Sequence, residues 1–460
     1  MKRVAILTAG GDTPALNATI LGAVERAGQL RLEMVGIIKG FSGLLNPDVP
    51  HVFLNPLYKS IPELDATQGG TILGASRDYI DGEDRETIAR VAERLARLRI
   101  DGLICVGGDG TLNGMQPLGE HLPTVLAPKT IDNDLGLNYL DEANEWMLAS
   151  PDDPAGRRYA KRPGRGFELD EMVNFATPGY ATAVLVSSQN VQRIRTTAES
   201  HRRVAIIEVM GRDSGMIALG TAYGQPDLIL VPESPVDPET LVHRVMAVLD
   251  VQKHAVICVS EGIKDKDGHI LGSMTVSKDP AGNIQYSGAG EAVKRLLVDR
   301  IGDEHFTDRR RNESAEAAIF IRKIGHTQRG GRPIRFDRFY ASALGGKAVD
   351  LLVEGHSNCV ATLQYRDGGF ALEGVDANRL RDRWGTIHAR PLSPTFYDAE
   401  RFQPSPQGIA YLRAIFTNAL GADDTESQRN LFSTGNLTHP YHSVNVDIAK
   451  RIRRLPDDAG

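Results

Sequence analysis

The sequence predicts an α/β protein built on mainly parallel sheets that helices cover on both faces. Apolar runs as short as buried strands alternate with helix-like segments through the first 260 residues. Such alternation is typical of βαβ units. Several runs end in glycine or polar clusters, as in Gly10-Gly11-Asp12 and Gly107-Gly108-Asp109-Gly110. Because open α/β sheets bind ligands at the carboxyl ends of their strands, a site is expected at these clusters.

The expected elements follow from apolar runs and helical periodicity. Strands are predicted at 4–8, 34–38, 103–106, 125–127, 204–209, 228–231, 255–259, 318–324, 359–364 and 370–372. Helices are predicted at 15–27, 85–98, 180–196, 215–223, 238–249, 287–300, 341–352 and 408–419. Two stretches interrupt the pattern and are interpreted as insertions. Residues 140–172 are polar and predict a loop with one short helix, whereas 264–285 carry turn signals that predict a β-hairpin.

Length and charge exclude several classes of protein. At about 100–200 residues per domain, 460 residues predict two or three domains. The formal charge of −6 gives no excess of Lys and Arg, so neither nucleic acid nor an anionic membrane surface is an expected partner. No apolar run reaches the ~18 residues of a membrane span. Three distant cysteines, Cys105, Cys258 and Cys359, predict neither a disulfide framework nor a zinc site, which makes the cytoplasm the expected location.

Two glycine-rich loops could bind an anion. Gly107-Gly108-Asp109-Gly110-Thr111 follows the apolar run LICV, and its glycines allow close backbone approach to phosphate oxygens. Asp109 offers a carboxylate for the Mg²⁺ that a nucleotide brings. Gly10 and Gly11 hold the equivalent position after the first strand. Each loop alone is also compatible with an ordinary turn, but two at neighbouring strand ends predict a phosphate site.

The segment from Pro128 to Asp134, PKTIDND, is the strongest local feature. It places a cation, a hydroxyl and two carboxylates within seven positions, and alternation would send Thr130, Asp132 and Asp134 to one side of an extended chain. Phosphoryl transfer to an alcohol needs a carboxylate that accepts the hydroxyl proton, with cations around the transferring group. The alternative is an Asx-rich loop that caps a helix.

Further polar residues stand in glycine-rich turns or at strand ends. Arg77 ends GGTILGASR and could clamp phosphates, although the same pattern is equally compatible with a solvated loop arginine. His326 and Arg329 lie in GHTQRGG and offer an imidazole and a guanidinium. Glu261 ends a buried strand, where a carboxylate needs partners such as a sugar hydroxyl or a helix N-terminus.

In order and spacing, these motifs resemble the phosphofructokinase family, which includes ATP- and diphosphate-dependent enzymes. The resemblance runs from Gly10 to about residue 350 through GGD, GGTILGASR, GGDGT, PKTIDND, SHRRVAIIEVMGR, ILVPE, SEG and GHTQRGG. It implies two similar doubly wound domains with the active site between them. The expected boundaries are an N-terminal donor domain (1–139), the insertion (140–172), a sugar-phosphate domain (173–375, with the chain crossing back between domains) and a C-terminal extension (376–460). The family also implies homo-oligomers, dimers or tetramers, with shared active sites.

The resemblance implies a role for each matching residue. Asp132 would be the general base for the 1-hydroxyl of fructose 6-phosphate, helped by Arg77 and Lys129, and Asp109 would bind Mg²⁺. The donor would lie along Gly10, Arg77, Gly107, Gly108, Asp109, Gly110 and Thr111. The sugar phosphate would be held by Thr130, Asp132, Arg203, Met210, Gly211, Arg212, Glu261, His326 and Arg329, with Arg203 reaching a neighbouring subunit's site.

Two positions bear on the phosphoryl donor. In this family Gly at position 110 goes with ATP and Asp goes with diphosphate, because a carboxylate there would repel the α-phosphate. The residue before Thr-Ile-Asp-Asn-Asp tends to be Lys in the family's diphosphate users and Gly in the common bacterial ATP enzymes, so Lys129 points to diphosphate. The combination of Gly110 and Lys129 resembles ATP-dependent members related to the diphosphate-dependent group. We weigh Gly110 more heavily because it acts by exclusion, and we therefore expect an ATP-dependent 6-phosphofructokinase of glycolysis. A diphosphate-dependent phosphotransferase is the first alternative.

Three departures from the family pattern bear on the acceptor. The family's Gly-Phe-Asp-Thr-Ala segment is GYATA at 179–183 here, without the carboxylate, and the insertion at 140–172 falls beside the site motifs. Phe320 replaces the arginine that binds the sugar 6-phosphate, and Arg322 is the candidate to compensate. A kinase for another sugar or polyol is therefore a second alternative. NAD and diacylglycerol kinases share Gly-Gly-Asp-Gly but lack the other motifs, and a non-catalytic subunit would leave Asp109, Asp132 and Arg77 unexplained.

Overall fold

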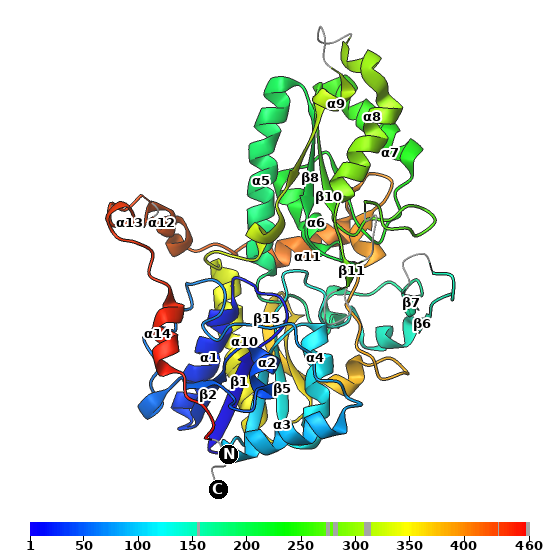
Figure 1. Ribbon diagram of the computed structural model, residues 1–460. Coiled ribbons are helices and arrows are strands. Elements are labelled where there is room, and N and C mark those ends of the chain that lie inside the picture. The colour runs from blue at the N-terminus through cyan, green and yellow to red at the C-terminus, as the bar shows by residue number, and fades with distance from the viewer. Residues whose placement is uncertain (154–156, 273–276, 279–283, 308–313, 431, 457–460) are drawn as a thin grey trace.

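The computed structural model describes residues 1–153, 157–272, 277–278, 284–307, 314–430 and 432–456. The described residues form two large sheets, one above the other in Figure 1, and the N-terminus lies below the lower sheet. Helices flank each sheet, so the predicted α/β class is confirmed. In the part of the chain that is described, no helix has the length and apolar character to cross a membrane.

The lower sheet has seven strands in the order β15-β14-β5-β4-β1-β2-β3. Strands β14, β5, β4, β1 and β2 run parallel, and an antiparallel strand closes each edge. Every residue of β4 and β5 is buried, as expected for parallel strands covered on both faces. The bounds are β1 Arg3–Thr8, β2 Glu33–Ile37, β3 His51–Phe53, β4 Gly102–Gly107, β5 Thr124–Pro128, β14 Cys359–Arg366 and β15 Gly369–Asp376.

Five helices pack on the lower sheet: α1 Leu16–Gln29, α2 Gly40–Leu45, α3 Arg85–Arg97, α4 Asp109–Met115 and α10 Arg335–Val353. Helices α1 and α10 lie in close contact on one face. A Cβ at Gly22 would stand 1.9 Å from the carbonyl oxygen of Ser342, so the contact requires glycine there. Helix α3 begins where the Asp84 carboxylate accepts a hydrogen bond from the Thr87 amide.

The upper sheet has four parallel strands in the order β13-β8-β10-β9. Its strands are β8 Val204–Val209, β9 Leu228–Leu230, β10 Ala255–Ser260 and β13 Ile319–Lys323. Its helices are α5 Tyr180–His201, α6 Met216–Gly220, α7 Pro238–Gln252, α8 Ala289–Thr307 and α9 Ala315–Ala318. The chain leaves the upper sheet after β13 and returns through α10 to β14 and β15 of the lower sheet. The range 173–375 expected for the second domain therefore contains parts of both sheets.

The two presumed insertions form small hairpins. In 140–172, the structure has antiparallel strands β6 Trp146–Leu148 and β7 Tyr159–Lys161 between 3-10 turns at Leu140–Glu145 and Leu169–Glu171, instead of a plain loop with one helix. In 264–285, β11 Ser277–Lys278 pairs with β12 Ile284–Gln285 in antiparallel fashion, which confirms a hairpin. The predicted turn at 281–283 lies outside the described residues. Other 3-10 turns are Pro56–Tyr58, Gln116–Glu120, Thr221–Gly224, Gly325–Gln328, Ala377–Leu380 and Pro394–Phe396.

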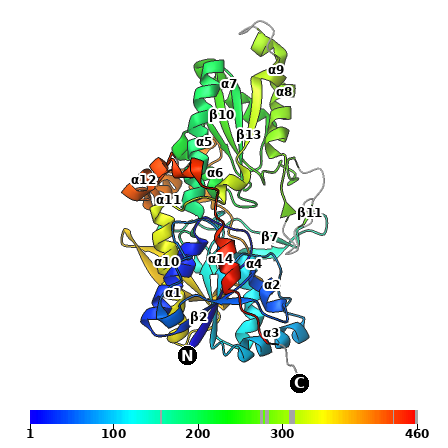
Figure 2. The same cartoon turned by 60° about the vertical axis from the view of Figure 1, so that its left-hand side comes forward.

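The C-terminal extension visits both sheets. It first pairs β16 Tyr397–Asp398 with β17 Gln403–Pro404, where the Tyr397 hydroxyl donates to the Ile229 carbonyl of β9. Helix α11 Pro406–Phe416 then lies between the two sheets (Figure 1). Helices α12 Ala422–Asn430 and α13 Gly435–Thr438 project to one side, and α14 Val444–Arg451 returns along the lower part of the molecule (Figure 2).

Candidate active site

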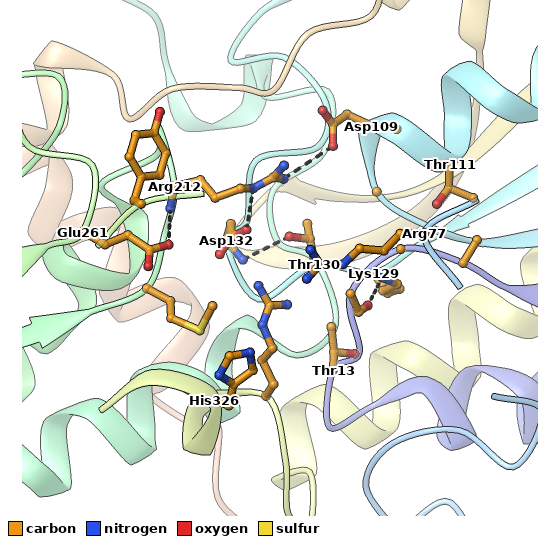
Figure 3. A pocket seen from close by; sticks show the side chains of 18 of the residues that line it. Thr13, Arg77, Asp109, Thr111, Lys129, Thr130, Asp132, Arg212, Glu261 and His326 are labelled. Atoms are coloured by element: carbon orange, nitrogen blue, oxygen red, sulfur yellow. Dashed lines mark hydrogen bonds and ion pairs between the residues drawn. The ribbon is translucent and has the colours of Figure 1, made fainter. Parts of the chain in front are cut away.

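A cavity of about 390 Å³ opens between the two sheets (Figure 3). Residues that follow β1, β4 and β5 form one wall, and residues at the carboxyl ends of β8, β10 and β13 form the other. Ligand sites of open α/β sheets are expected at this edge. The predicted residues that line the cavity are Gly10, Arg77, Gly108, Asp109, Gly110, Thr111, Lys129, Thr130, Asp132, Met210, Arg212, Glu261, His326 and Arg329.

Backbone and glycines make up much of the first wall. Gly10 has a φ of +77°, a conformation that side chains disfavour. A Cβ at Gly107 would stand 2.1 Å from the Thr111 hydroxyl oxygen, so glycine is required for the turn into α4. At Gly110 an added Cβ would meet nothing within 4 Å. The wall is therefore packed behind Gly107 and open beside Gly110.

The PKTIDND loop leaves β5 and turns sharply. It is not extended, because Asn133 takes a left-handed conformation with φ of +55°. Asp132 and Asp134 nevertheless reach the same guanidinium, that of Arg212, at 3.2 and 2.9 Å. The predicted common side of the two carboxylates is thus correct, but a bend produces it rather than strand alternation. The second carboxylate oxygen of Asp132 is buried and accepts no hydrogen bond from the described residues.

Arg212 connects the two walls. It follows β8 in the upper sheet and crosses the cavity to three carboxylates of the lower sheet, with Asp109 at 3.6 Å in addition to Asp132 and Asp134 (Figure 3). Burial lowers the pKa of the guanidinium, but the three carboxylates outweigh this effect and hold it well above its usual range. Burial also raises the pKa of Asp134, against the opposing effect of Arg212.

Lys129 is the buried cation of the first wall. It is 3% exposed, and its ammonium donates a hydrogen bond to the Gly11 carbonyl. Burial, followed by the charge of Arg329, lowers the pKa of Lys129 to about 7, while Asp12 acts in the opposite direction. A polyanion placed at the glycine loops would favour the charged form of this lysine.

Long polar side chains dominate the second wall. Glu261 accepts hydrogen bonds from the amides of Gly211 and Arg212 at 3.3 and 3.2 Å, and burial followed by the charge of Asp132 raises its pKa to about 7. His326 stands in the turn Gly325–Gln328 at the foot of the cavity (Figure 3). The Gln328 side chain accepts from the Met210 amide at 3.0 Å, which ties this turn to the end of β8.

Comparison with known proteins identifies the family. The sequence model of the family described as phosphofructokinase matches residues 3–139 and 170–352, well over half of the chain. This chain belongs to the phosphofructokinase family. The break in the match falls within the segment that the sequence analysis interpreted as an insertion, and the match ends before the C-terminal extension.

Curated relatives of this phosphofructokinase differ in the phosphoryl donor that their names state. The ATP-dependent 6-phosphofructokinase 2 of Streptomyces coelicolor is 35% identical over 373 residues, which cover 79% of this chain and 92% of the relative. The pyrophosphate–fructose 6-phosphate 1-phosphotransferase of the same organism is 31% identical over 404 residues, which cover 86% and 98%. The solved pyrophosphate-dependent phosphofructokinase of Nitrosospira multiformis shares the two-domain fold, with a TM-score of 0.67 at 18% identity, covering 91% of this chain and 92% of that one.

Three predicted residues of this phosphofructokinase do not line the cavity. Gly107 and Gly211 lie next to lining residues and shape the backbone behind them. Arg203 precedes β8, whereas Met210 follows it, so about 20 Å of strand separates the two. Arg203 therefore stands at the far edge of the upper sheet, away from the cavity of its own chain.

Phe320 lies at the same far edge as Arg203. In the sheet register it is the partner of Ala205, only two residues beyond Arg203. It packs against the core, and the Arg322 guanidinium lies 5.7 Å from its ring. Arg322 does not line the cavity, so within one chain it does not take the place of the missing arginine.

The sequence analysis missed several residues of the site. The cavity is also lined by Thr13, Phe41, Tyr79, Tyr286 and Lys323. Lys323 ends β13 and its ammonium pairs with the buried Glu208 carboxylate at 2.5 Å. Its position at the carboxyl end of a strand was a usable signal. Tyr286 follows the hairpin and donates to Asp213 at 2.7 Å, a contact that no local pattern reveals.

Proposed function

We propose that this phosphofructokinase transfers the γ-phosphoryl group of ATP to the 1-hydroxyl of fructose 6-phosphate. The observation that carries the proposal is the Asp132 carboxylate, 2% exposed, with one oxygen bound by Arg212 and the other without a hydrogen-bond partner in the described part of the chain. Such an oxygen is available to accept the proton of a substrate hydroxyl. The glycine loops of the first wall suit the polyphosphate, and the charged second wall suits the sugar phosphate.

The residues of the cavity can also account for Mg²⁺. Asp109 and Asp132 bring carboxylate oxygens to one side of the cavity, and Mg²⁺ prefers such ligands together with phosphate oxygens and water. We propose that Asp109 is the metal ligand. When bound, the ion would neutralise charge on the transferring group. Arg212, which pairs with Asp109, Asp132 and Asp134, would then be available to the phosphates.

Gly110 supports ATP as the donor. An added side chain at this position would project into open space. The resemblance implies that a nucleotide's α-phosphate occupies this space. Lys129 supports diphosphate as the alternative, because the family tends to carry lysine at this position in its diphosphate-dependent members; its ammonium binds the Gly11 carbonyl at the glycine loop. We give Gly110 the greater weight, since a carboxylate there would exclude ATP whereas a lysine at position 129 assists either donor.

We further propose that the enzyme is a cytoplasmic homo-oligomer. About 20 Å of strand separates Arg203 from Met210 at the cavity of its own chain, so a role for Arg203 in binding a sugar phosphate requires a neighbouring subunit. The three cysteines are free and buried, which suits a reducing compartment.

The decisive experiment compares donors and acceptors in one assay. Purified protein is tested with ATP and with diphosphate, in the presence of Mg²⁺, against fructose 6-phosphate, other sugar phosphates and free polyols. We expect the highest kcat/KM with ATP and fructose 6-phosphate. A higher kcat/KM with diphosphate would overturn the donor assignment, and a preference for an unphosphorylated acceptor would overturn the acceptor.

A further inference from the structure

The C-terminal extension reaches the PKTIDND loop from behind the cavity. Arg390 is 2% exposed, and its guanidinium donates one hydrogen bond to the Asn174 carbonyl at 2.5 Å and another to the Asn133 carbonyl at 2.8 Å. Its backbone amide donates to the Asp134 carbonyl at 2.5 Å. One residue thus binds both positions that follow Asp132, although it lies more than 250 residues away in sequence.

Asn133 is the hinge of this loop. Its left-handed backbone places the bend between Asp132 and Asp134, and asparagine tolerates that conformation better than most side chains. Its side-chain NH2 group donates to the Tyr411 hydroxyl at 2.5 Å, and its side-chain oxygen Oδ1 accepts from the Thr177 amide at 2.9 Å. Tyr411 in turn donates to the Phe175 carbonyl at 2.8 Å. Every polar group of the Asn133 side chain is therefore held by a segment outside the loop.

A buried arginine at this place calls for a physical reason. Burying a charge is costly unless it is well hydrogen-bonded. Arg390 forms no ion pair with a carboxylate of the described chain; it binds main-chain carbonyls instead. A planar guanidinium presents its donors in a fixed fork, so it can hold two carbonyls from two segments at a set separation, which a lysine cannot do.

We propose that Arg390 is a positioning residue that fixes the Asp132 carboxylate for proton transfer by clamping the carbonyls of Asn133 and Asn174. Tyr411 supports the same bend through the Asn133 side chain. The inference rests on the proposed role of Asp132. It assigns part of the catalytic geometry to the C-terminal extension, which lies beyond the family match at 352.

The test compares Arg390→Met, which keeps the length without the fork, with Arg390→Lys, which keeps the charge. We expect Arg390→Met to lower kcat about ten- to a hundredfold, the scale of an angstrom-sized misplacement, while the KM for fructose 6-phosphate stays within about threefold. Arg390→Lys should recover part of the loss. Because a loosened loop displaces the base and leaves the sugar-phosphate contacts in place, the loss should appear in kcat rather than in KM.

Tyr397→Phe is the matched control. It removes one hydrogen bond to a main-chain carbonyl from the same extension, but its partner is Ile229 of β9, away from the loop. It is expected to change thermal stability without changing kcat or KM. If Arg390→Met and Arg390→Lys both match this control in kcat and in KM, Arg390 is only structural and the proposal is wrong.

A readout without turnover separates this inference from the proposed function. Amide hydrogen exchange of the segment 130–134 should accelerate at least about tenfold in Arg390→Met and remain at the wild-type rate in Tyr397→Phe, since local opening governs exchange. If the wild type does not phosphorylate fructose 6-phosphate but exchange responds as expected, the proposed function fails and the clamp stands. If exchange in the segment is unchanged, the clamp is refuted regardless of activity.

Discussion

The two walls of the cavity present different groups to a ligand. The first wall, called the lower wall here because it belongs to the lower sheet, places backbone at the surface, with Gly10, Gly108 and Gly110 in the lining and Gly107 packed behind them. The second wall, called the upper wall, places side chains there, with Arg212, Glu261 and Lys323 extending from strand ends. A backbone cradle fixes shape and tolerates little substitution, whereas long charged side chains can exchange partners. Under the proposed function, this contrast predicts that donor choice depends on space and that acceptor choice depends on charge.

Among substitutions in the two walls, loss of the proposed base Asp132 should lower kcat the most. Asp132→Asn keeps the shape of the side chain and its position beside Arg212 but cannot accept a proton. We expect kcat to fall about 10²–10⁴-fold with sugar-phosphate binding largely retained. Steady-state kinetics together with equilibrium binding of fructose 6-phosphate measure both effects. Asp141→Asn, at an exposed carboxylate, serves as the control, and a kcat for Asp132→Asn within a few-fold of wild type would remove Asp132 from this role.

Mixing two inactive variants tests whether the upper wall is completed by a neighbouring subunit. Arg203→Ala and Asp132→Asn should each be nearly inactive alone. In randomly mixed dimers, about a quarter of the sites combine an intact Asp132 with an intact Arg203, so up to about a quarter of the wild-type rate should return. Activity is measured after dissociation and reassociation. Proven subunit exchange without recovery of activity would show that the sites are not shared.

Phe320 provides a second test of charge in the upper wall. We expect the wild type to phosphorylate fructose 6-phosphate with a high KM, because one charge-assisted contact is missing, and Phe320→Arg to lower that KM about ten- to a hundredfold. Since Phe320 and Arg203 share the far edge of the sheet, the gain should appear only in the oligomer. Phe320→Leu is the uncharged control. If Phe320→Arg instead abolishes the native activity, the ring recognises a different acceptor.

Gly110 tests the dependence of the lower wall on space. Gly110→Ala should fold normally and keep most activity, because an added Cβ meets nothing within 4 Å. Gly110→Asp adds a charge to the same space and should reduce kcat/KM for ATP at least about tenfold, since each 1.4 kcal/mol of repulsion is a factor of ten. For diphosphate, which places no α-phosphate there, kcat/KM should stay the same or rise. Equal losses with both donors would mean that Gly110 does not discriminate between them.

The same contrast explains what could be predicted from the sequence. Strands and helices followed from apolar runs, and the strand at 204–209 agrees with the structure residue for residue, because burial on both faces leaves a local signal. Glycine loops and PKTIDND were recognisable because their chemistry is contiguous. Tyr286 and Arg390 were not, since each meets the site only through the fold, whereas Lys323 was overlooked although its place at the end of a strand was a usable signal. The resemblance implied that the chain crosses back between the domains, but the residues that do so, 335–376, are set by strand pairing, which local sequence does not specify.

The smallest expected effect is a pH-dependent change in stability caused by the buried carboxylate of Glu261 in the upper wall. Its pKa is raised to about 7, first by burial and then by Asp132, whereas an unfolded chain titrates near 4.3. The folded state therefore holds a proton that the unfolded state has lost between those values. The resulting stability is fully present below about pH 4.3 and disappears as the pH rises through about 7, by at most about 1.4 kcal/mol per pH unit.

Glu261→Gln removes this titration while its carbonyl oxygen can still accept from the amides of Gly211 and Arg212. The variant should come nearest to the wild type in Tm at about pH 4, where the carboxyl is mostly neutral in both the folded and the unfolded chain. At pH 8 the wild type holds a buried charge beside Asp132, so the variant should melt a few degrees higher. Thermal melts at both pH values, with the exposed Glu93→Gln as control, measure the difference. Because Lys129 has its pKa lowered by burial, Lys129→Met should change stability in the opposite sense, with the wild type gaining as the pH rises from about 7 towards 10. If the Tm difference between Glu261→Gln and the wild type does not vary with pH, burial in the upper wall does not oppose the ionisation of Glu261.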